Sequence, residues 1–253
     1  MEAIGSTLGN VKRASHVVDR SPLDLARFAG FLYLVIAVLS GFVHFYVPGQ
    51  LIVSGDAATT ARSIMASEGL FRINIAAELV IVLSEVVLSV LLYVLLRPVS
   101  RACSLVMMVS RLTMTAIHGI NILNNVVVLL LLSGVGYLTV FAPGQLHALV
   151  MLFLDAYRYG FQIGIAIFAL HTAVLGYLIY RSGFFPRVLG ILFMIAPVGY
   201  LVDSFGLVLV PGHTTGAVYL ALPITIAEVA FPLWLLVKGV HVARWKQRAL
   251  GAA

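Results

Sequence analysis

The sequence predicts an all-α membrane protein, a polytopic bundle of six transmembrane helices. Hydrophobic residues make up 61% of the 253-residue chain and charged residues only 10%, whereas a soluble domain carries about 25% charged residues. The apolar residues also come in long runs, and a helix of about 20 apolar residues is what crosses the hydrocarbon core of a bilayer. Composition therefore excludes an ordinary water-soluble fold.

Six apolar runs, separated by Pro, Gly and Arg residues, define the expected helices. Pro and Gly follow several of the runs, while Pro143 begins one at a favoured first-turn position. At about 1.5 Å per residue, the third and fourth runs exceed the bilayer thickness, so their helices should tilt or project. The expected spans are residues 27–47, 73–96, 103–133, 143–180, 186–210 and 216–240.

Lys and Arg residues are concentrated on one side of this topology. Twelve of the sixteen lie in the N-terminal segment, the second and fourth connections and the C-terminal tail, against Arg62 and Arg72 on the other side. Because cytoplasmic loops carry the excess of Lys and Arg, both termini should be cytoplasmic, in the cell inner membrane. The expected organisation is a cytoplasmic segment 1–26, a transmembrane domain 27–241 and a basic cytoplasmic tail 242–253.

The formal net charge of +6 indicates membrane lipids as partners. The basic residues stand beside the ends of apolar runs, where they contact anionic headgroups. No basic stretch with interleaved aromatics lies outside the spans, so nucleic acid is not an expected partner. A homo-oligomer stays open.

One connection on the less basic side, residues 49–71, is long enough for a helix of its own. Asp56 is placed to cap a short helix over residues 57–66. Ile64 and Phe71 are apolar, which suits a helix lying in the headgroup region. We favour an interfacial connector over a lid.

Polar and ionisable residues recur within the expected spans. Such groups are costly in hydrocarbon and mark functional sites. Steps of 3, 4 and 7 residues place those of the second span on one helix face and those of the third on another. The candidate site residues are Glu78, Glu85, Arg111, His118, Asn121, Asn125, Asp155, Arg158, Gln162, Asp203 and Glu228.

These stripes cannot face lipid, so we expect them to face one another around a polar cavity that opens outward. Five carboxylates meet only two arginines, Arg111 and Arg158, so at most two can be paired one-to-one. The others must be protonated, hydrated, hydrogen-bonded or neutralised by a bound cation. No metal or cofactor is expected, because no H-E-x-x-H and no pair of histidines at i, i+4 occurs. The pattern leaves the catalytic residues, if any, unknown.

Structural explanations compete for several of these residues. Asp155 and Arg158 at i, i+3 can form an ion pair on a single helix, and His118 can be a hydrogen-bonded core residue. Gly160 and Gly164 form a small-x-x-x-small step that indicates close helix packing.

Several stretches carry a family resemblance. They are Arg27-FAGFLYLVIAV, LIVSGDAATTARSIMASEGLFR ending at Arg72, LFLDAYRYGFQIG around Asp155 and GYLVDSF around Asp203. With these stretches the chain resembles the bacterial family named domain of unknown function 4386, from about residue 24 to 240. The resemblance implies a bacterial six-helix inner-membrane protein and carries over no catalytic residues.

The leading functional expectation is binding or translocation of a small polar or cationic species, or of protons, through the outward-facing cavity. An intramembrane acid–base enzyme acting on a lipid or isoprenoid is the first alternative, because protonatable carboxylates also serve as general acids. A structural or sensory membrane subunit is the second, because the polar stripes could simply hold helices together.

Overall fold

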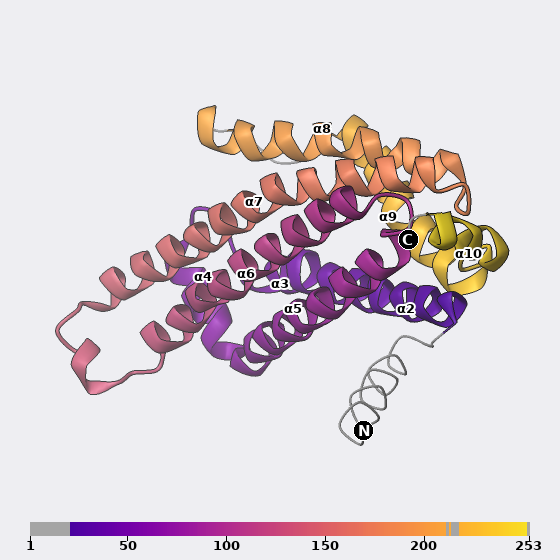
Figure 1. Cartoon of the computed structure of the whole chain (residues 1–253). Helices are drawn as coiled ribbons and strands as arrows, with labels where there is room; N and C mark the ends of the chain where they lie inside the picture. The colour runs from indigo at the N-terminus through magenta and orange to yellow at the C-terminus, as the bar shows by residue number, and fades with distance from the viewer. Residues whose placement is uncertain (1–20, 211–212, 214–217, 252–253) are drawn as a thin grey trace, which may run out of the picture.

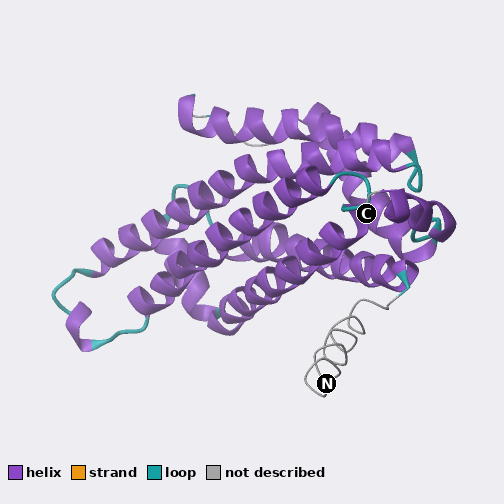
Figure 2. Ribbon diagram, viewed as in Figure 1, coloured by secondary structure: helices purple, strands orange, loops and turns teal. Residues whose placement is uncertain are grey.

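The computed structural model describes residues 21–210, 213 and 218–251, with only the backbone for residues 218–224. The described residues are helical, joined by short loops and turns, and contain no strand (Figure 2). Most of the predicted segment 1–26 lies outside the described residues.

Five helices in the described part of the chain are long and apolar enough to cross a membrane. The described part of α9 (Val218–Val237) forms with α10 (Val242–Gly251) a pair bent by 97°, which counts at most as a sixth span. The chain is therefore a multi-pass membrane protein. The five are Pro22–Leu51 (α2, Pro22–Gly41, to α3, Val47–Leu51), α5 (Glu68–Leu96), α6 (Arg101–Leu132), α7 (Pro143–Ser182) and α8 (Arg187–Leu209).

The first span is longer than predicted at both ends. It begins at Pro22, where the Ser21 hydroxyl caps it, and continues beyond Pro48. Proline lacks an N–H and its ring presses on the carbonyl four residues back. The helix meets this with a π-helical turn over Phe42–Tyr46, in which the Val47 N–H bonds the Phe42 carbonyl. The wider turn lets the span pass through the proline, so the predicted end was wrong.

The five spanning helices and α9 form a closed ring. Contacts join α6 to α7, α7 to α8, α8 to α9, α9 to α2, α2 to α5 and α5 back to α6 (Figure 1). One apolar core, with Leu95, Leu178 and Phe231, fills the end where α10 lies. A second, with Phe71 and Val128, fills the opposite end. The intramembrane polar residues of α5 and α6 lie between the two cores.

The predicted short helix is present as α4 (Ala57–Ala66). The Asp56 carboxylate caps it by accepting the Thr59 backbone N–H at 2.9 Å and the Thr59 hydroxyl at 2.7 Å. Ala61 and Ile64 are fully buried, and α4 packs against α7 and α3. The prediction of a capped helix is confirmed, and this helix closes one end of the bundle.

Candidate functional site

A buried arginine holds four helices together. The Arg111 guanidinium of α6 is 1% exposed and donates through Nε and Nη2 to both oxygens of Glu85 on α5. Its Nη1 donates to the Tyr33 hydroxyl of α2 at 2.8 Å. The planar fork matches a carboxylate in this two-bond arrangement, which is the strong form of the ion pair. We call Tyr33, Glu85, Arg111 and His171 the arginine cluster.

His171 of α7 completes the arginine cluster. Its Nε2 lies 3.0 Å from Arg111 Nη1, and its Nδ1 lies 2.9 Å from the Met107 carbonyl oxygen. A guanidinium can only donate, so Nε2 must accept, and Nδ1 must carry the hydrogen that the carbonyl accepts. The ring is therefore neutral, and the cluster contains one positive and one negative group. Its hydrogen-bonding groups are satisfied internally, which leaves nothing for a ligand to bind.

A second buried carboxylate, two helical turns away on α5, has different partners. Glu78 Oε1 accepts the side-chain amides of Asn74 at 2.8 Å and Asn125 at 2.9 Å. The Tyr157 side chain of α7 makes a third hydrogen bond to Glu78. Among the described residues no Lys or Arg forms an ion pair with Glu78. We call Asn74, Glu78, Asn125 and Tyr157 the Glu78 cluster.

One acceptor in the Glu78 cluster has no partner. Asn74 is 5% exposed, and its Oδ1 is buried without a hydrogen bond. Its amide nitrogen is already committed to Glu78, so exchanging the two ends of the amide would break that bond. A buried unsatisfied acceptor destabilises the fold by about 1–3 kcal/mol. Such an atom in a native structure calls for an explanation, and a bound donor is one.

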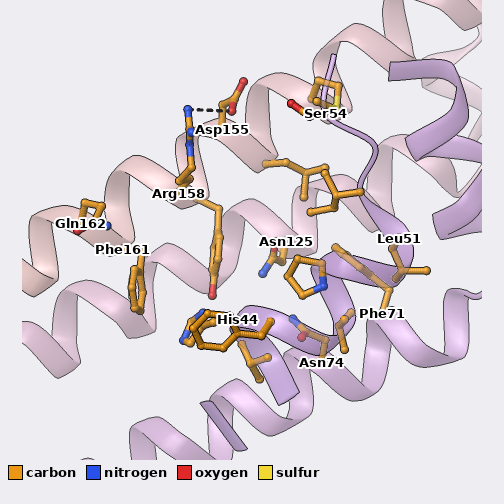
Figure 3. Close-up of a pocket in the computed structure, with 18 residues that line it drawn as sticks. His44, Leu51, Ser54, Phe71, Asn74, Asn125, Asp155, Arg158, Phe161 and Gln162 are labelled. Atoms are coloured by element: carbon orange, nitrogen blue, oxygen red, sulfur yellow. Dashed lines mark ion pairs between the residues drawn. The ribbon is translucent and has the colours of Figure 1, made fainter. Parts of the chain in front are cut away.

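Asn74 lines a pocket of about 470 Å³ (Figure 3). Asn125 and Tyr157 line the pocket as well, and Leu51 and Phe71 contribute apolar walls. The volume lies within the range of small-molecule sites, which combine apolar walls with a few convergent polar groups. No residue of α4 lines it, so the structure provides no support for a lid role of that helix.

A smaller cavity of about 30 Å³ shares lining residues with this pocket. It is lined by Glu78, His118 and Asn121, and it shares His44, Tyr157 and Phe161 with the larger pocket. A volume of this size holds about one water molecule. The pocket and the cavity thus bring Glu78 close to the space available to a ligand.

Two glycines of α7 make room for the polar side chains of α6. A Cβ added to Gly160 would lie 2.1 Å from Asn121 Oδ1, and one added to Gly164 would lie 2.1 Å from His118 Nε2. Asn121 donates to the Tyr157 carbonyl at 2.8 Å, and His118 Nε2 lies 3.2 Å from the Phe161 carbonyl. The predicted close helix packing at these glycines is confirmed.

Asp155 and Arg158 depart from the expectation that the stripe on the fourth span is buried. Their side chains are 55% and 53% exposed and pair with each other at 3.6 Å. They lie at the edge of the pocket, away from Asn74 (Figure 3). At 40 residues and about 1.5 Å per residue, α7 is longer than a bilayer is thick, so its outer turns need not turn inward. The prediction of burial was wrong for this pair.

The remaining three candidates form separate contacts. Gln162 accepts a hydrogen bond from the Ser204 hydroxyl of α8 at 3.3 Å, although it also lines the pocket. Asp203 lies 3.5 Å from His213, beyond the end of α8. Glu228 of α9 accepts the hydroxyl of Tyr200. The structure therefore divides the candidate set instead of gathering it around one cavity.

Several site residues were missed from the sequence. Tyr33 and His44 stand eleven residues apart, three turns of one helix face, in an otherwise apolar span, and that spacing was a usable signal. Tyr157 gave no such signal among its polar neighbours. His171 was not among the candidates either, although it lies in the arginine cluster. Among the described residues no group of three or more His, Cys, Asp or Glu is placed to hold a metal ion.

The helical ring with its two buried polar clusters defines an integral membrane protein of the multi-pass class. More particularly, the chain belongs to the family described as domain of unknown function (DUF4386), which it matches over residues 28–239. It is 30% identical over 166 residues to an uncharacterized protein of Archaeoglobus fulgidus, covering 66% of this chain and 83% of the relative. No solved structure matches the chain. The family resemblance that the sequence predicts is thereby confirmed.

Proposed function

We propose that this protein binds a small cationic solute, with a hydrogen-donating head and a short apolar body, in the pocket beside the Glu78 cluster. The observation that carries the proposal is the Asn74 side chain, which lines the pocket and whose Oδ1 atom has no partner in the fold; the atom is closed off from the pocket here, so a ligand would reach it by turning the side chain. A ligand that donates a hydrogen bond there would remove the cost of leaving it unsatisfied.

The charge balance favours a cation over a neutral or anionic solute. The hydrogen bonds identified at Glu78 come from neutral groups, two amides and a phenol. Arg158, the arginine that lines the pocket, pairs with Asp155 instead. An ionised carboxylate without a counter-charge is costly inside a membrane protein. A bound ammonium group would supply that counter-charge.

The proposed site faces away from the basic end of the molecule. Arg97, Arg101, Arg181 and Arg187 lie at the ends of helices on the α10 side, and the pocket lies toward the other end. The excess of Arg and Lys assigns the α10 side to the cytoplasm, so the proposed pocket opens outward. The arginine cluster lies between the pocket and the basic side, and passage of a solute would require its hydrogen bonds to break. The proposed activity is therefore binding, with transport as a further step.

Three six-carbon probes test the proposal on the purified protein in mild detergent. Hexylammonium, hexan-1-ol and hexanoate share an apolar body and differ in the charge of the head. Isothermal titration calorimetry should detect hexylammonium, weaker hexanol and no hexanoate. Asn74→Leu, which keeps the shape and removes the acceptor, should weaken hexylammonium about tenfold, as expected for one hydrogen bond to a charged group.

Glu68→Gln is the matched control, because Glu68 is an exposed carboxylate of the same helix that pairs with Arg72. It should leave hexylammonium binding unchanged. Equal binding of hexanol and hexylammonium would contradict the proposal and favour the alternative of a lipid or isoprenoid enzyme, whose substrate needs only the apolar walls. No binding by any probe, with Asn74→Leu merely less stable, would favour a structural subunit.

A further inference from the structure

A second pocket, of about 380 Å³, lies at the opposite end of the bundle. The turn between α7 and α8 forms one wall through Phe184 and Pro186. Trp234 and Lys238, at the end of α9, form another, and Arg244 of α10 closes the third side. This pocket shares no residue with the one beside the Glu78 cluster, so a ligand bound here is independent of the solute proposed there.

The polar groups around this pocket are hydrogen-bond donors and cations. The Trp234 Nε1 atom is buried and has no partner. The Lys238 ammonium and the Arg244 guanidinium are exposed, and Arg244 uses only one identified bond, to the Gly183 carbonyl at 3.0 Å. Among the described residues that line the pocket there is no Asp or Glu. Cationic side chains without a carboxylate to pair with favour an anion.

Backbone donors reinforce the same preference. Pro186 is the N-cap of α8, which has no side-chain cap, and His241 directly precedes α10. Both residues line the pocket. The first N–H groups of a helix lack partners within it, and they carry the positive end of its dipole. Two helix starts therefore meet at one cavity beside Lys238 and Arg244, an arrangement suited to phosphate.

The surroundings indicate that this phosphate belongs to a lipid. Val237 of α9, which adjoins Lys238, and Val188 of α8, two residues after Pro186, are both exposed. In a membrane protein such exposed apolar side chains contact acyl chains. Trp, Lys and Arg are also the residues that gather at headgroup depth. A phospholipid would thus place its phosphate in the pocket and its chains along α8 and α9.

We propose that the pocket between Pro186, Trp234, Lys238 and Arg244 binds the phosphate of an anionic membrane phospholipid. A zwitterionic choline lipid should bind more weakly, because its cationic group would meet Lys238 and Arg244 with no carboxylate in the lining to pair with. Bound lipid would join α10 to the α7–α8 turn. The Trp245 indole already ties α10 to the Leu95 carbonyl at 2.8 Å.

Native mass spectrometry of the full chain in detergent tests this with defined lipids. Titration with phosphatidylglycerol should give a one-lipid complex at concentrations where phosphatidylcholine gives about tenfold less. Trp234→Phe removes the unpartnered N–H together with part of the indole ring; it should bind phosphatidylglycerol about tenfold more weakly, and its thermal midpoint, measured beside the affinity, shows whether the fold is kept. Lys238→Gln should weaken phosphatidylglycerol binding at least as much. Arg72→Gln, a basic residue at the other end, should bind like the wild type.

The competing sources of phosphate give distinct results. Millimolar inorganic phosphate should not displace the lipid, because it gains nothing from the apolar flanks. Displacement by inorganic phosphate at low concentration would overturn the lipid proposal in favour of a soluble anion. Equal affinity for the two lipids, or unchanged affinity in both Trp234→Phe and Lys238→Gln, would also overturn it.

Discussion

Two carboxylates on the same face of α5 have opposite surroundings. Glu85 bonds a buried guanidinium through both oxygens, and its cluster satisfies its own groups. Glu78, seven residues earlier, is bound by neutral donors and lies beside an acceptor that nothing in the fold satisfies. Identical side chains at equivalent helical positions thus serve different ends. The hydrogen-bond partners of a buried carboxylate decide whether it holds helices together or remains available to bind a ligand.

Arg111 contacts α2, α5 and α7 at once, because its guanidinium bonds Tyr33, Glu85 and His171. A buried ion pair replaced by apolar residues is often no less stable, but losing one partner alone is strongly destabilising. The arginine cluster should therefore be sensitive to single changes. The Glu78 cluster, built on neutral hydrogen bonds, should tolerate a neutral isostere.

The largest effect is expected from Arg111→Met. The change leaves Glu85 ionised and buried without its counter-charge, so the free energy of unfolding should fall by about 3–5 kcal/mol. Equilibrium unfolding with dodecyl sulfate in mixed micelles measures it. Arg158→Gln, which breaks an exposed pair, should cost under about 1 kcal/mol. Similar losses for the two variants would remove the distinction between the clusters.

A smaller loss is expected from Gly164→Ala at the α6–α7 contact. The new methyl group would meet His118 Nε2 at 2.1 Å, and overpacking of this kind costs about 1–3 kcal/mol. His118→Ala should relieve most of that cost in the double variant. A double-mutant cycle measures the coupling. Strict additivity would mean that the helices separate there freely.

Asp155→Asn should have a slight effect, although this carboxylate lies on the pocket edge. Its pair with Arg158 is more than half exposed, so the free energy of unfolding should change by less than about 1 kcal/mol. Hexylammonium affinity should fall less than about threefold, and the difference should disappear in about 1 M salt because exposed charges are screened. A large, salt-independent loss would move the binding site outward from Glu78.

The smallest effect concerns an exposed carboxylate that, like Glu78, accepts from neutral donors. The Thr59 backbone N–H and hydroxyl hold the pKa of the Asp56 carboxyl below its usual value. Its folded-state pKa is thus lower than its unfolded one, so the ionised cap stabilises α4 above the unfolded pKa. That stabilisation is lost as the pH falls through the folded pKa. Hydrogen exchange of the first-turn amides should accelerate there in the wild type and be pH-insensitive, after correction for intrinsic exchange, in Asp56→Ala.

The all-helical fold and its five spanning helices were predictable because the bilayer imposes a minimum length and an apolar character on every span. The stripes on α5 and α6 were predictable for the same reason, since Glu78, Arg111 and Asn125 could not remain in lipid. Asp155 was wrongly predicted to be buried, because α7 is longer than the bilayer is thick and its outer turns need not lie in lipid. Which faces of α7 make contacts was harder still to predict, because a helix that lies between two neighbours buries opposite faces. Gln162 contacts α8 and His171 contacts α6.

The orphan Asn74 oxygen could not be predicted at all. Whether an amide finds a partner depends on side-chain geometry between helices, and the sequence pattern specifies only the helix face. The same holds for the Trp234 indole, whose surroundings come from three separate segments.

The most direct test compares Glu78→Gln with Glu85→Gln in two measurements, the free energy of unfolding and the affinity for hexylammonium. Glu78→Gln should unfold within about 1 kcal/mol of the wild type and lose hexylammonium binding by tenfold or more. Glu85→Gln should lose about 3–5 kcal/mol of stability, yet its folded fraction should bind the probe like the wild type. Undiminished binding by Glu78→Gln, or lost binding with full stability in Glu85→Gln, would contradict the assignment of ligand binding to one carboxylate and helix association to the other.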